Sequence, residues 1–201
     1  MKAAGPLIGV LALQGDVREH MRSLEAVGAR AVSVRSVETL AQIDALVIPG
    51  GESTTMSKLA ILDGFLDPLR EARGSGMPMY GSCAGLIMLA DRVTDARHDQ
   101  ETVGGLDVTV RRNAFGRQVD SFEADVDMPS IGTAPFRAVF IRAPRVDEVG
   151  PEVEVLARVG DDGTIVAVRQ GRLMATAFHP ELTGDHRIHE AFVNLVSRSQ
   201  G

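Results

Sequence analysis

The sequence predicts an α/β fold with a mostly parallel sheet. Three observations support this: a continuous apolar run at Leu7–Leu13, strand-like and helix-like segments that alternate up to about residue 90, and turn residues between them. A run that is apolar at every position is typical of a strand buried on both faces. Strands that alternate with helices form parallel sheets covered by those helices.

The first strand is followed by a turn at Gln14-Gly15 and then by a predicted helix. Asp16 is expected to cap this helix, with Glu19 three residues on as in a capping box, and Gly28 is expected to end it. The later elements of this half are strands at 31–34, 45–48 and 77–80, a helical stretch at 53–73 with a break near Asp63-Gly64, and a helix at 84–90.

After Asp91 the pattern changes to strand-like segments with few helical windows. These segments are 107–111, 121–127, 138–142, 152–159, 164–169 and 173–178. Tight-turn residues at 161–163 and 170–171 predict that the last three strands form an antiparallel meander. An amphipathic helix over 185–197 follows. Neither a repeat nor a linker interrupts the pattern, which predicts one domain over residues 1–201.

The composition excludes several classes of protein. The 201 residues include 21 Lys plus Arg and 27 Asp plus Glu, a net charge of −6, and no basic block, which argues against nucleic-acid binding. The apolar runs are too short to span a bilayer and the first residues make a poor signal peptide, so a cytoplasmic protein without membrane contact is expected. Cys83 is the one cysteine, which leaves no disulfide within the chain and no multi-cysteine metal site. We expect neither a metal nor a cofactor.

Cys83 lies in the segment Gly81-Ser82-Cys83-Ala84-Gly85, at a predicted strand-to-helix turn. Glycines two residues before and after the cysteine are typical of a nucleophile elbow, whose strained turn has no room for bulky neighbours. The start of the following helix favours the thiolate, and the Ala84 amide would be one oxyanion-hole donor. Taken alone, the segment also fits a buried structural cysteine on a glycine-rich turn.

The segment Phe178-His179-Pro180-Glu181 supplies the partners that a cysteine nucleophile needs. His179 is the candidate base, and Glu181 can fix the tautomer of its imidazole. Alone, each has an ordinary explanation, a satisfied histidine at a strand end and a solvated carboxylate. Together with Cys83 they predict a Cys–His–Glu triad. A metal site is the weaker alternative, because two ligands do not make a site.

A glycine-rich loop, Pro49-Gly50-Gly51-Glu52-Ser53-Thr54, lies where the third strand meets a helix. Two glycines there allow backbone amides to approach an oxyanion or a carboxylate. A phosphate loop is the rival interpretation, but the chain has neither G-K-[ST] nor G-x-G-x-x-G. We expect Gly51 to be the second oxyanion-hole donor, with an ordinary glycine-rich turn as the alternative.

These motifs resemble those of class I, triad-type glutamine amidotransferases. More narrowly, the chain is similar to the glutaminase subunits of pyridoxal 5′-phosphate synthase complexes. The matching segments are 9–15 with 18–20, 49–56, 81–86, 112–113 with 115–124, 140–144, and 178–183 with 185–187. The resemblance implies a flavodoxin-like three-layer sandwich whose mostly parallel sheet has an antiparallel C-terminal portion.

The resemblance also implies an activity, the hydrolysis of L-glutamine to L-glutamate and ammonia. It makes Cys83 the nucleophile, His179 the base and Glu181 the residue that orients the base. The family's glutamine-binding positions correspond to Gly51, Glu52, Ser53, Arg112, Ile141 and Arg142. The chemistry agrees, because an arginine offers a two-pronged contact to an α-carboxylate. Surface charge is the alternative role for the two arginines.

The family further implies a partner, a (β/α)₈-barrel synthase subunit that receives the ammonia and makes pyridoxal 5′-phosphate. Up to twelve glutaminases are expected on a core of twelve synthase chains, and the free glutaminase is expected to be poorly active. The residues expected at this interface are Gln14, Gly15, Arg18, Glu19 and His20. The other histidines, His98, His186 and His189, are expected at solvated positions.

Two other functions compete with this one. The glutaminase of another ammonia-channelling synthase, such as imidazole glycerol phosphate synthase, would share the triad but differ in the partner-facing motifs. A non-hydrolytic redox or stress sensor of the same superfamily would use an elbow cysteine but would not need the late His-x-Glu. A pure interaction module would need none of the three triad residues.

Overall fold

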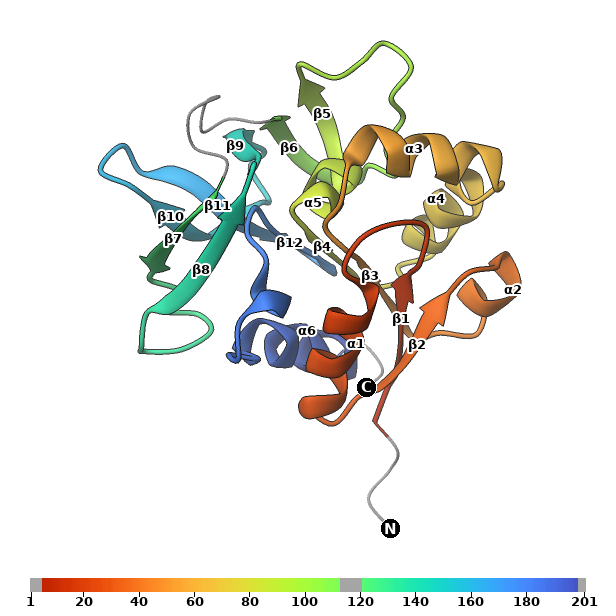
Figure 1. The fold of residues 1–201 in the computed structure, drawn as a ribbon, viewed down its shortest axis with the longest axis horizontal. Helices are drawn as coiled ribbons and strands as arrows, with labels where there is room; N and C mark the ends of the chain where they lie inside the picture. Colours follow the sequence, from red (N-terminus) through yellow and green to blue (C-terminus); the bar gives the residue numbers. More distant parts are fainter. Residues whose placement is uncertain (1–4, 113–120, 199–201) are drawn as a thin grey trace.

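A mixed sheet with helices on both sides forms the centre of the molecule (Figure 1). The computed structural model describes residues 5–112 and 121–198. Its strands are β1 (Leu7–Leu11), β2 (Arg30–Val34), β3 (Ala45–Ile48), β4 (Met79–Ser82), β5 (Ala90–Thr94), β6 (Leu106–Arg111), β7 (Ser121–Val126), β8 (Phe136–Ile141), β9 (Arg145–Val149), β10 (Glu154–Val159), β11 (Thr164–Gln170) and β12 (Leu173–Thr176). Its helices are α1 (Val17–Ala26), α2 (Val37–Leu40), α3 (Ser53–Leu62), α4 (Leu66–Gly74), α5 (Ala84–Leu89), the 3₁₀ turn η1 (Pro180–Leu182) and α6 (Arg187–Arg198).

The sheet has a parallel part and an antiparallel part. Strands β2, β1, β3, β4 and β12 lie side by side in that order and all run parallel. Beyond β12, strands β11, β9 and β6 pair antiparallel in turn, and β7 with β8 forms a separate antiparallel hairpin. The predicted mostly parallel, flavodoxin-like α/β sandwich is confirmed. The predicted meander of β10, β11 and β12 is present too.

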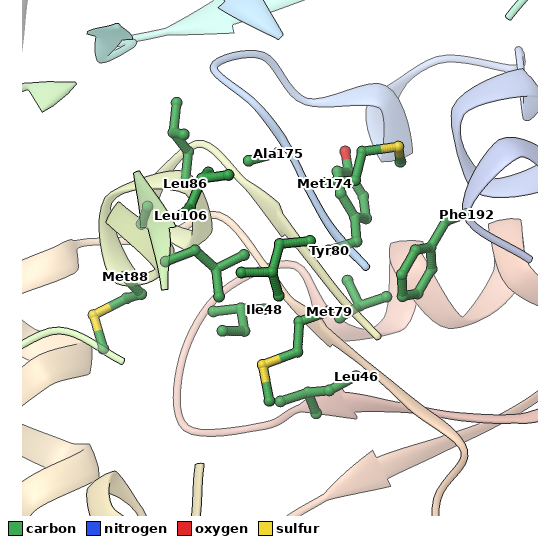
Figure 2. Packing of buried hydrophobic residues seen from close by; sticks show 14 of the residues in the cluster. Leu46, Ile48, Met79, Tyr80, Leu86, Met88, Leu106, Met174, Ala175 and Phe192 are labelled. Atoms are coloured by element: carbon green, nitrogen blue, oxygen red, sulfur yellow. The ribbon is translucent and has the colours of Figure 1, made fainter. Parts of the chain in front are cut away.

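Two layers of helices cover the parallel strands. Figure 1 shows α1 and α6 together on one side and α3, α4 and α5 on the other. The core consists of apolar side chains from the central strands and from these helices; Figure 2 labels Leu46, Ile48, Met79, Leu86, Met88 and Phe192 among them. The four residues of β3 and of β4 are all buried, which explains why β3, Ala-Leu-Val-Ile, is apolar on both faces.

Most of the predicted elements are confirmed within a few residues. Helix α1 begins after Asp16 and ends before Gly28, whose φ of 87° is the left-handed conformation expected of a glycine at a helix end. The predicted capping bond was wrong, because the Asp16 side chain caps no amide of the described helix. The predicted break in the second helix separates α3 from α4.

Four elements were not predicted: α2, β5, β9 and the 3₁₀ turn η1. Helix α2 has four residues, too few for a periodic pattern, although Ser36 caps it by accepting a hydrogen bond from the Thr39 amide. Helix α5 ends at Leu89, one residue before the end of the predicted helix, and strand β5 begins directly after it at Ala90. Strand β9 is rich in charged residues, and such a composition does not indicate a strand. It is part of the sheet because it pairs with β6 and β11.

Residues 113–120, which carry Asn113 and much of the Phe115–Ala124 motif, lie outside the described residues. In the part of the chain that the structure describes, none of the helices has the length and apolar composition that crossing a membrane requires.

Candidate active site

Cys83 lies on a strained turn between β4 and α5. Its φ of 51° and ψ of −103° lie outside the regions that side-chain-bearing residues ordinarily adopt, as a nucleophile elbow requires. Its amide donates to the Thr176 carbonyl of β12 at 2.8 Å, which fixes the turn against the sheet. The flanking glycines are required sterically: a Cβ at Gly81 would overlap the Gly85 backbone, and one at Gly85 would overlap the Ile48 carbonyl oxygen.

His179 follows the short extension of β12 and lies beside Cys83. Its amide donates to the Val139 carbonyl of β8 at 2.9 Å, which holds the backbone in place. The Nδ1 atom of its ring lies 2.7 Å from Oε1 of Glu181, the first acidic residue of η1. His179 and Cys83 line the same cleft. The structure therefore places the predicted base in a hydrogen bond with the predicted orienting carboxylate and in one cleft with the predicted nucleophile.

The electrostatics of these groups favour a charged imidazole. Burial opposes the charge on His179, but the neighbouring side chains of Cys83 and Glu181 outweigh burial and raise the pKa of His179 to about 10. Burial also raises the pKa of Glu181, and the neighbouring His179 offsets part of that rise. A charged imidazole beside a thiol is the arrangement that activates a cysteine nucleophile.

A cleft of about 340 Å³ opens over Cys83. Its lining contains the six residues expected to bind glutamine together with Cys83, Ala84 and His179. The complete lining is Asp16, Gly51, Glu52, Ser53, Cys83, Ala84, Ile87, Arg112, Ile141, Arg142, Pro144 and His179. The Ile141 carbonyl accepts from the Cys83 thiol at 3.8 Å, and Arg142 has a φ of 42°, so the chain turns sharply at the end of β8.

The glycine-rich loop before α3 is held from two sides. The Glu52 carboxylate caps α3 by accepting hydrogen bonds from the Thr54 and Thr55 amides at 3.0 and 2.8 Å. Burial opposes this charge, but these bonds outweigh it and lower the pKa of Glu52 to about 2. The Glu52 amide donates to Oε1 of Gln14 at 2.9 Å, which ties the loop to the end of β1.

Two polar residues at or beside the cleft were not predicted from the sequence as site residues. Gln100 accepts from Arg112 at 2.9 Å and donates to the Ser53 hydroxyl at 3.1 Å, so it braces two of the expected substrate ligands. Asp16 lines the cleft, with Oδ2 3.8 Å from Nδ1 of His179. The position of Asp16 at the carboxyl end of β1, the edge of the sheet where sites form, was the available signal.

Asp16, His179 and Glu181 offer three potential ligand atoms within 4.8 Å of one another, which is a possible metal site. However, Nδ1 of His179 and Oε1 of Glu181 already share a 2.7 Å hydrogen bond. A metal would have to break that bond, and the remaining contact of Asp16 is long. This geometry favours a base and its orienting group over a metal centre.

The residues expected at a partner interface fall into two groups. Gln14, Gly15, Arg18 and Glu19 line a surface groove of about 560 Å³ at the start of α1. His20 does not belong with them: its side chain is completely buried, so the expectation that it lies at an interface was wrong. His189 is also completely buried, contrary to the solvated position expected for it, whereas His98 is exposed and His186 is partly buried.

Comparison with known proteins decides the family. Residues 10–198 match the SNO glutamine amidotransferase family. The chain belongs to this family. It is therefore an enzyme of the glutamine amidotransferase class, which hydrolyses glutamine.

Similar proteins agree with this assignment. The chain is 63% identical over 195 residues to "Pyridoxal 5′-phosphate synthase subunit PdxT" of Acidothermus cellulolyticus, which covers 96% of this chain and 94% of that protein. It is 60% identical over 201 residues to the protein of the same name from Kineococcus radiotolerans, covering 98% and 97%. A solved structure described as a crystal structure of glutamine amidotransferase is 47% identical, with a TM-score of 0.87 over 94% of this chain and 98% of that one. The structure of PurLQS from Thermotoga maritima, at 17% identity and a TM-score of 0.70, shares the fold.

Proposed function

We propose that this chain is the glutaminase subunit of a pyridoxal 5′-phosphate synthase, in which it releases ammonia from L-glutamine for vitamin B6 biosynthesis. The names of relatives at 60–63% identity support the pathway. The observation that carries the chemistry is the position of His179, which lies 2.7 Å from Glu181 and lines the same cleft as Cys83 and the expected glutamine ligands.

In the first half of the proposed reaction, the Cys83 thiolate attacks the side-chain amide carbon of glutamine. The oxyanion that develops accepts hydrogen bonds from the Gly51 and Ala84 amides. His179 then gives its proton to the departing nitrogen, and ammonia leaves as a glutamyl thioester forms on Cys83. Glu181 holds the imidazole in the tautomer that this transfer needs.

In the second half, His179 takes a proton from a water molecule, which attacks the thioester carbon. The same two amides stabilise the second oxyanion, and its collapse breaks the carbon–sulfur bond. Glutamate leaves and the thiolate returns beside the charged imidazole. Arg112 and Arg142 are proposed to bind the α-carboxylate of the substrate during both steps, since guanidinium groups match carboxylate geometry.

The groove at the start of α1 is the proposed docking surface for a (β/α)₈-barrel synthase subunit, in an assembly of up to twelve chains of each kind. Gln14 lies in this groove and also bonds to the Glu52 amide, next to the proposed oxyanion donor Gly51. A partner that moves Gln14 therefore acts on the oxyanion loop. Poor activity of the free subunit, a cytoplasmic location and a single domain over residues 1–201 belong to the same proposal.

The deciding experiment measures glutamate release from L-glutamine by the wild type and by Cys83→Ala, each with and without the cognate synthase. Activity that requires both Cys83 and the synthase is expected, with a loss of several orders of magnitude in the variant. Measurable glutaminase activity in Cys83→Ala would overturn the mechanism. Activity that depends on Cys83 but not on the synthase would support the glutaminase activity and contradict the assigned pathway.

The docking surface has its own test, charge reversal at Arg18 and at Glu19, with complex formation followed by size-exclusion chromatography. Arg137→Glu is a suitable control, because Arg137 lies in the exposed hairpin of β7 and β8 and outside the groove. Loss of complex in the groove variants alone is expected. Complex formation that survives both reversals would argue against this surface.

A further inference from the structure

A pair of buried histidines lies behind the proposed triad. His20 comes from α1 and His189 from α6, and the side chains of both are completely shielded from solvent. Nδ1 of His20 lies 2.9 Å from Nε2 of His189. The proposed reaction assigns no step to either ring. Burying two imidazoles costs free energy unless their polar nitrogens find hydrogen-bond partners. The contacts of this pair therefore need a structural or chemical explanation.

The pair touches the triad through Glu181. Nε2 of His20 lies 3.4 Å from Oε2 of Glu181 and 3.0 Å from the Ser82 hydroxyl, which is next to Cys83 in the chain. The other carboxylate oxygen, Oε1, is bonded to His179. Among the described residues, Oε2 has no hydrogen-bond partner, and Nε2 of His20, 3.4 Å away, is positioned to supply the donor. Long contacts of this kind are common in enzymes without substrate and tighten when substrate binds.

The protonation state of the pair follows from burial. Burial, together with the neighbouring His189 and His179, lowers the pKa of His20 well below its usual value. Burial and His186 lower the pKa of His189 to about 3. Both rings are therefore neutral at physiological pH, and each has one N–H to place.

The contacts then select the tautomers. If Nε2–H of His189 donates to Nδ1 of His20, the N–H of His20 lies at Nε2 and faces Glu181 and Ser82. The reverse arrangement leaves an N–H at Nδ1 of His189, an atom that is buried and has no partner among the described residues. It also turns a lone pair of His20 toward the Glu181 carboxylate. A buried N–H without an acceptor costs more than a buried lone pair, so the first arrangement is favoured.

We propose that His20, with its tautomer set by His189, is a positioning residue that donates its Nε2–H to Glu181 and so fixes the carboxylate that orients His179. This inference rests on the proposed triad. Two imidazole N–H groups then hold the two oxygens of one buried carboxylate, His179 on the side of the cleft and His20 on the side of the core. Tyr80 of β4 also faces the pair, with its ring edge-on to both histidines and centroids 6.1 Å away, and His186 is a further neighbour of His189.

The test compares His20→Gln with His20→Leu. The glutamine amide can donate an N–H near the position of Nε2, whereas leucine of similar size cannot. Removing the donor weakens the support of Glu181 for the charged His179, so less thiolate forms at neutral pH. We expect His20→Leu to lower kcat for glutamine hydrolysis, measured with the synthase, by about 10- to 100-fold with KM changed less than about threefold. His20→Gln should keep most of the activity.

The second readout is the pH profile of Cys83 alkylation by iodoacetamide, which is free of ambiguity because the chain has one cysteine. In His20→Leu the profile should move to higher pH, and in His20→Gln it should follow the wild type. Leu24→Val is the matched control, since Leu24 is buried on the same helix and its apolar side chain offers these groups no hydrogen bond. It should lower thermal stability without moving the profile.

The outcomes separate the positioning role from the triad itself. An unchanged kcat and alkylation profile in His20→Leu, or equal losses in the Leu and Gln variants, would overturn the positioning role. If His20→Leu fails to fold, His189→Leu takes its place, with the same displaced profile expected and an unchanged profile contradicting the inference. Retained glutaminase activity in Cys83→Ala would instead remove the triad on which the inference rests.

Discussion

Gly50 lies directly against the ring of His179. A Cβ atom added to Gly50 would overlap Cε1 of the imidazole and lie 2.9 Å from Nδ1, the atom that bonds to Glu181. The backbone of the loop before α3 is thus one wall of the pocket that holds the proposed base. Gly15 packs in turn against Gly50, since a Cβ at Gly15 would overlap the Gly50 carbonyl oxygen. These glycines permit a close approach that any side chain would prevent.

Gly50→Ala should therefore impair catalysis more than folding. The added methyl group pushes the imidazole away from Glu181, and a displacement of about 1 Å can cost roughly 100-fold in rate. We expect kcat for glutamine hydrolysis to fall at least about tenfold. Gly74→Ala is the control, because Gly74 ends α4 at an exposed position where an added methyl group would meet nothing within 4 Å. A wild-type kcat in Gly50→Ala would mean that the loop moves away from the imidazole of His179 and that the ring keeps its position.

The elements buried on both faces were predictable from the sequence. The strands Leu7–Leu11 and Ala45–Ile48 are apolar throughout because helices cover them on both sides. Strand β9 was not predictable, because Arg145 and Asp147 form an ion pair at 2.7 Å and give the segment the composition of a surface loop. Its identity as a strand depends on pairing with β6, from which β7 and β8 separate it in the chain, and with β11, from which β10 separates it.

The grouping of Cys83, His179 and Glu181 at one cleft was predictable because its local signals are steric and short-range. Glycines at 81 and 85 are required by the turn at Cys83, and Pro180 lies between His179 and Glu181. His20 was misassigned because its partners come from distant segments, Ser82 and His189 among them. One signal could have shown its burial: His20 is three residues after Val17 and four before Leu24, on the apolar face of α1.

Arg112→Lys should weaken glutamine binding rather than turnover. Arg112 is largely buried, lines the cleft and is held by Gln100 at 2.9 Å and Glu52 at 3.3 Å. A lysine cannot reproduce this planar fork. We expect KM for glutamine to rise roughly 10- to 100-fold, the loss of a charged hydrogen bond worth about 1.5–3 kcal/mol, with kcat within about threefold.

Arg137→Lys is the control for that measurement, since Arg137 pairs with Glu123 and Asp125 on an exposed hairpin and does not line the cleft. Its kinetic constants should equal those of the wild type. If Arg112→Lys lowered kcat and left KM unchanged, Arg112 would act in the transition state and not in binding of the α-carboxylate.

Gly85→Ala should destabilise the fold although alanine favours helices. Gly85 lies in α5, but a Cβ there would overlap the Ile48 carbonyl oxygen of β3, and a backbone atom cannot move aside as a side chain can. We expect a loss of about 1–3 kcal/mol in the free energy of unfolding by urea, the range for overpacking a core. Gly74→Ala should be neutral or stabilising in the same assay. Equal stability of the two variants would contradict this prediction and show that α5 can move away from β3 without loss of stability.

The buried histidines also predict how stability depends on acid. Burial lowers the pKa of His189 to about 3, whereas the unfolded chain takes up this proton near pH 6.5. As pH falls below about 6.5, the unfolded state binds a proton that the native state refuses until about pH 3. The free energy of unfolding therefore falls with acidification in this window, by up to about 1.4 kcal/mol per pH unit from this group.

His189→Gln removes that titration, so its free energy of unfolding should fall less steeply than that of the wild type between about pH 6.5 and pH 4. Urea unfolding at several pH values measures the difference. His98→Gln is the matched control, because it makes the same exchange at an exposed position and so reports the effect of the substitution itself. Equal slopes in His189→Gln and the wild type would mean that native His189 accepts the proton, and that the neutral tautomer assigned to the pair is wrong.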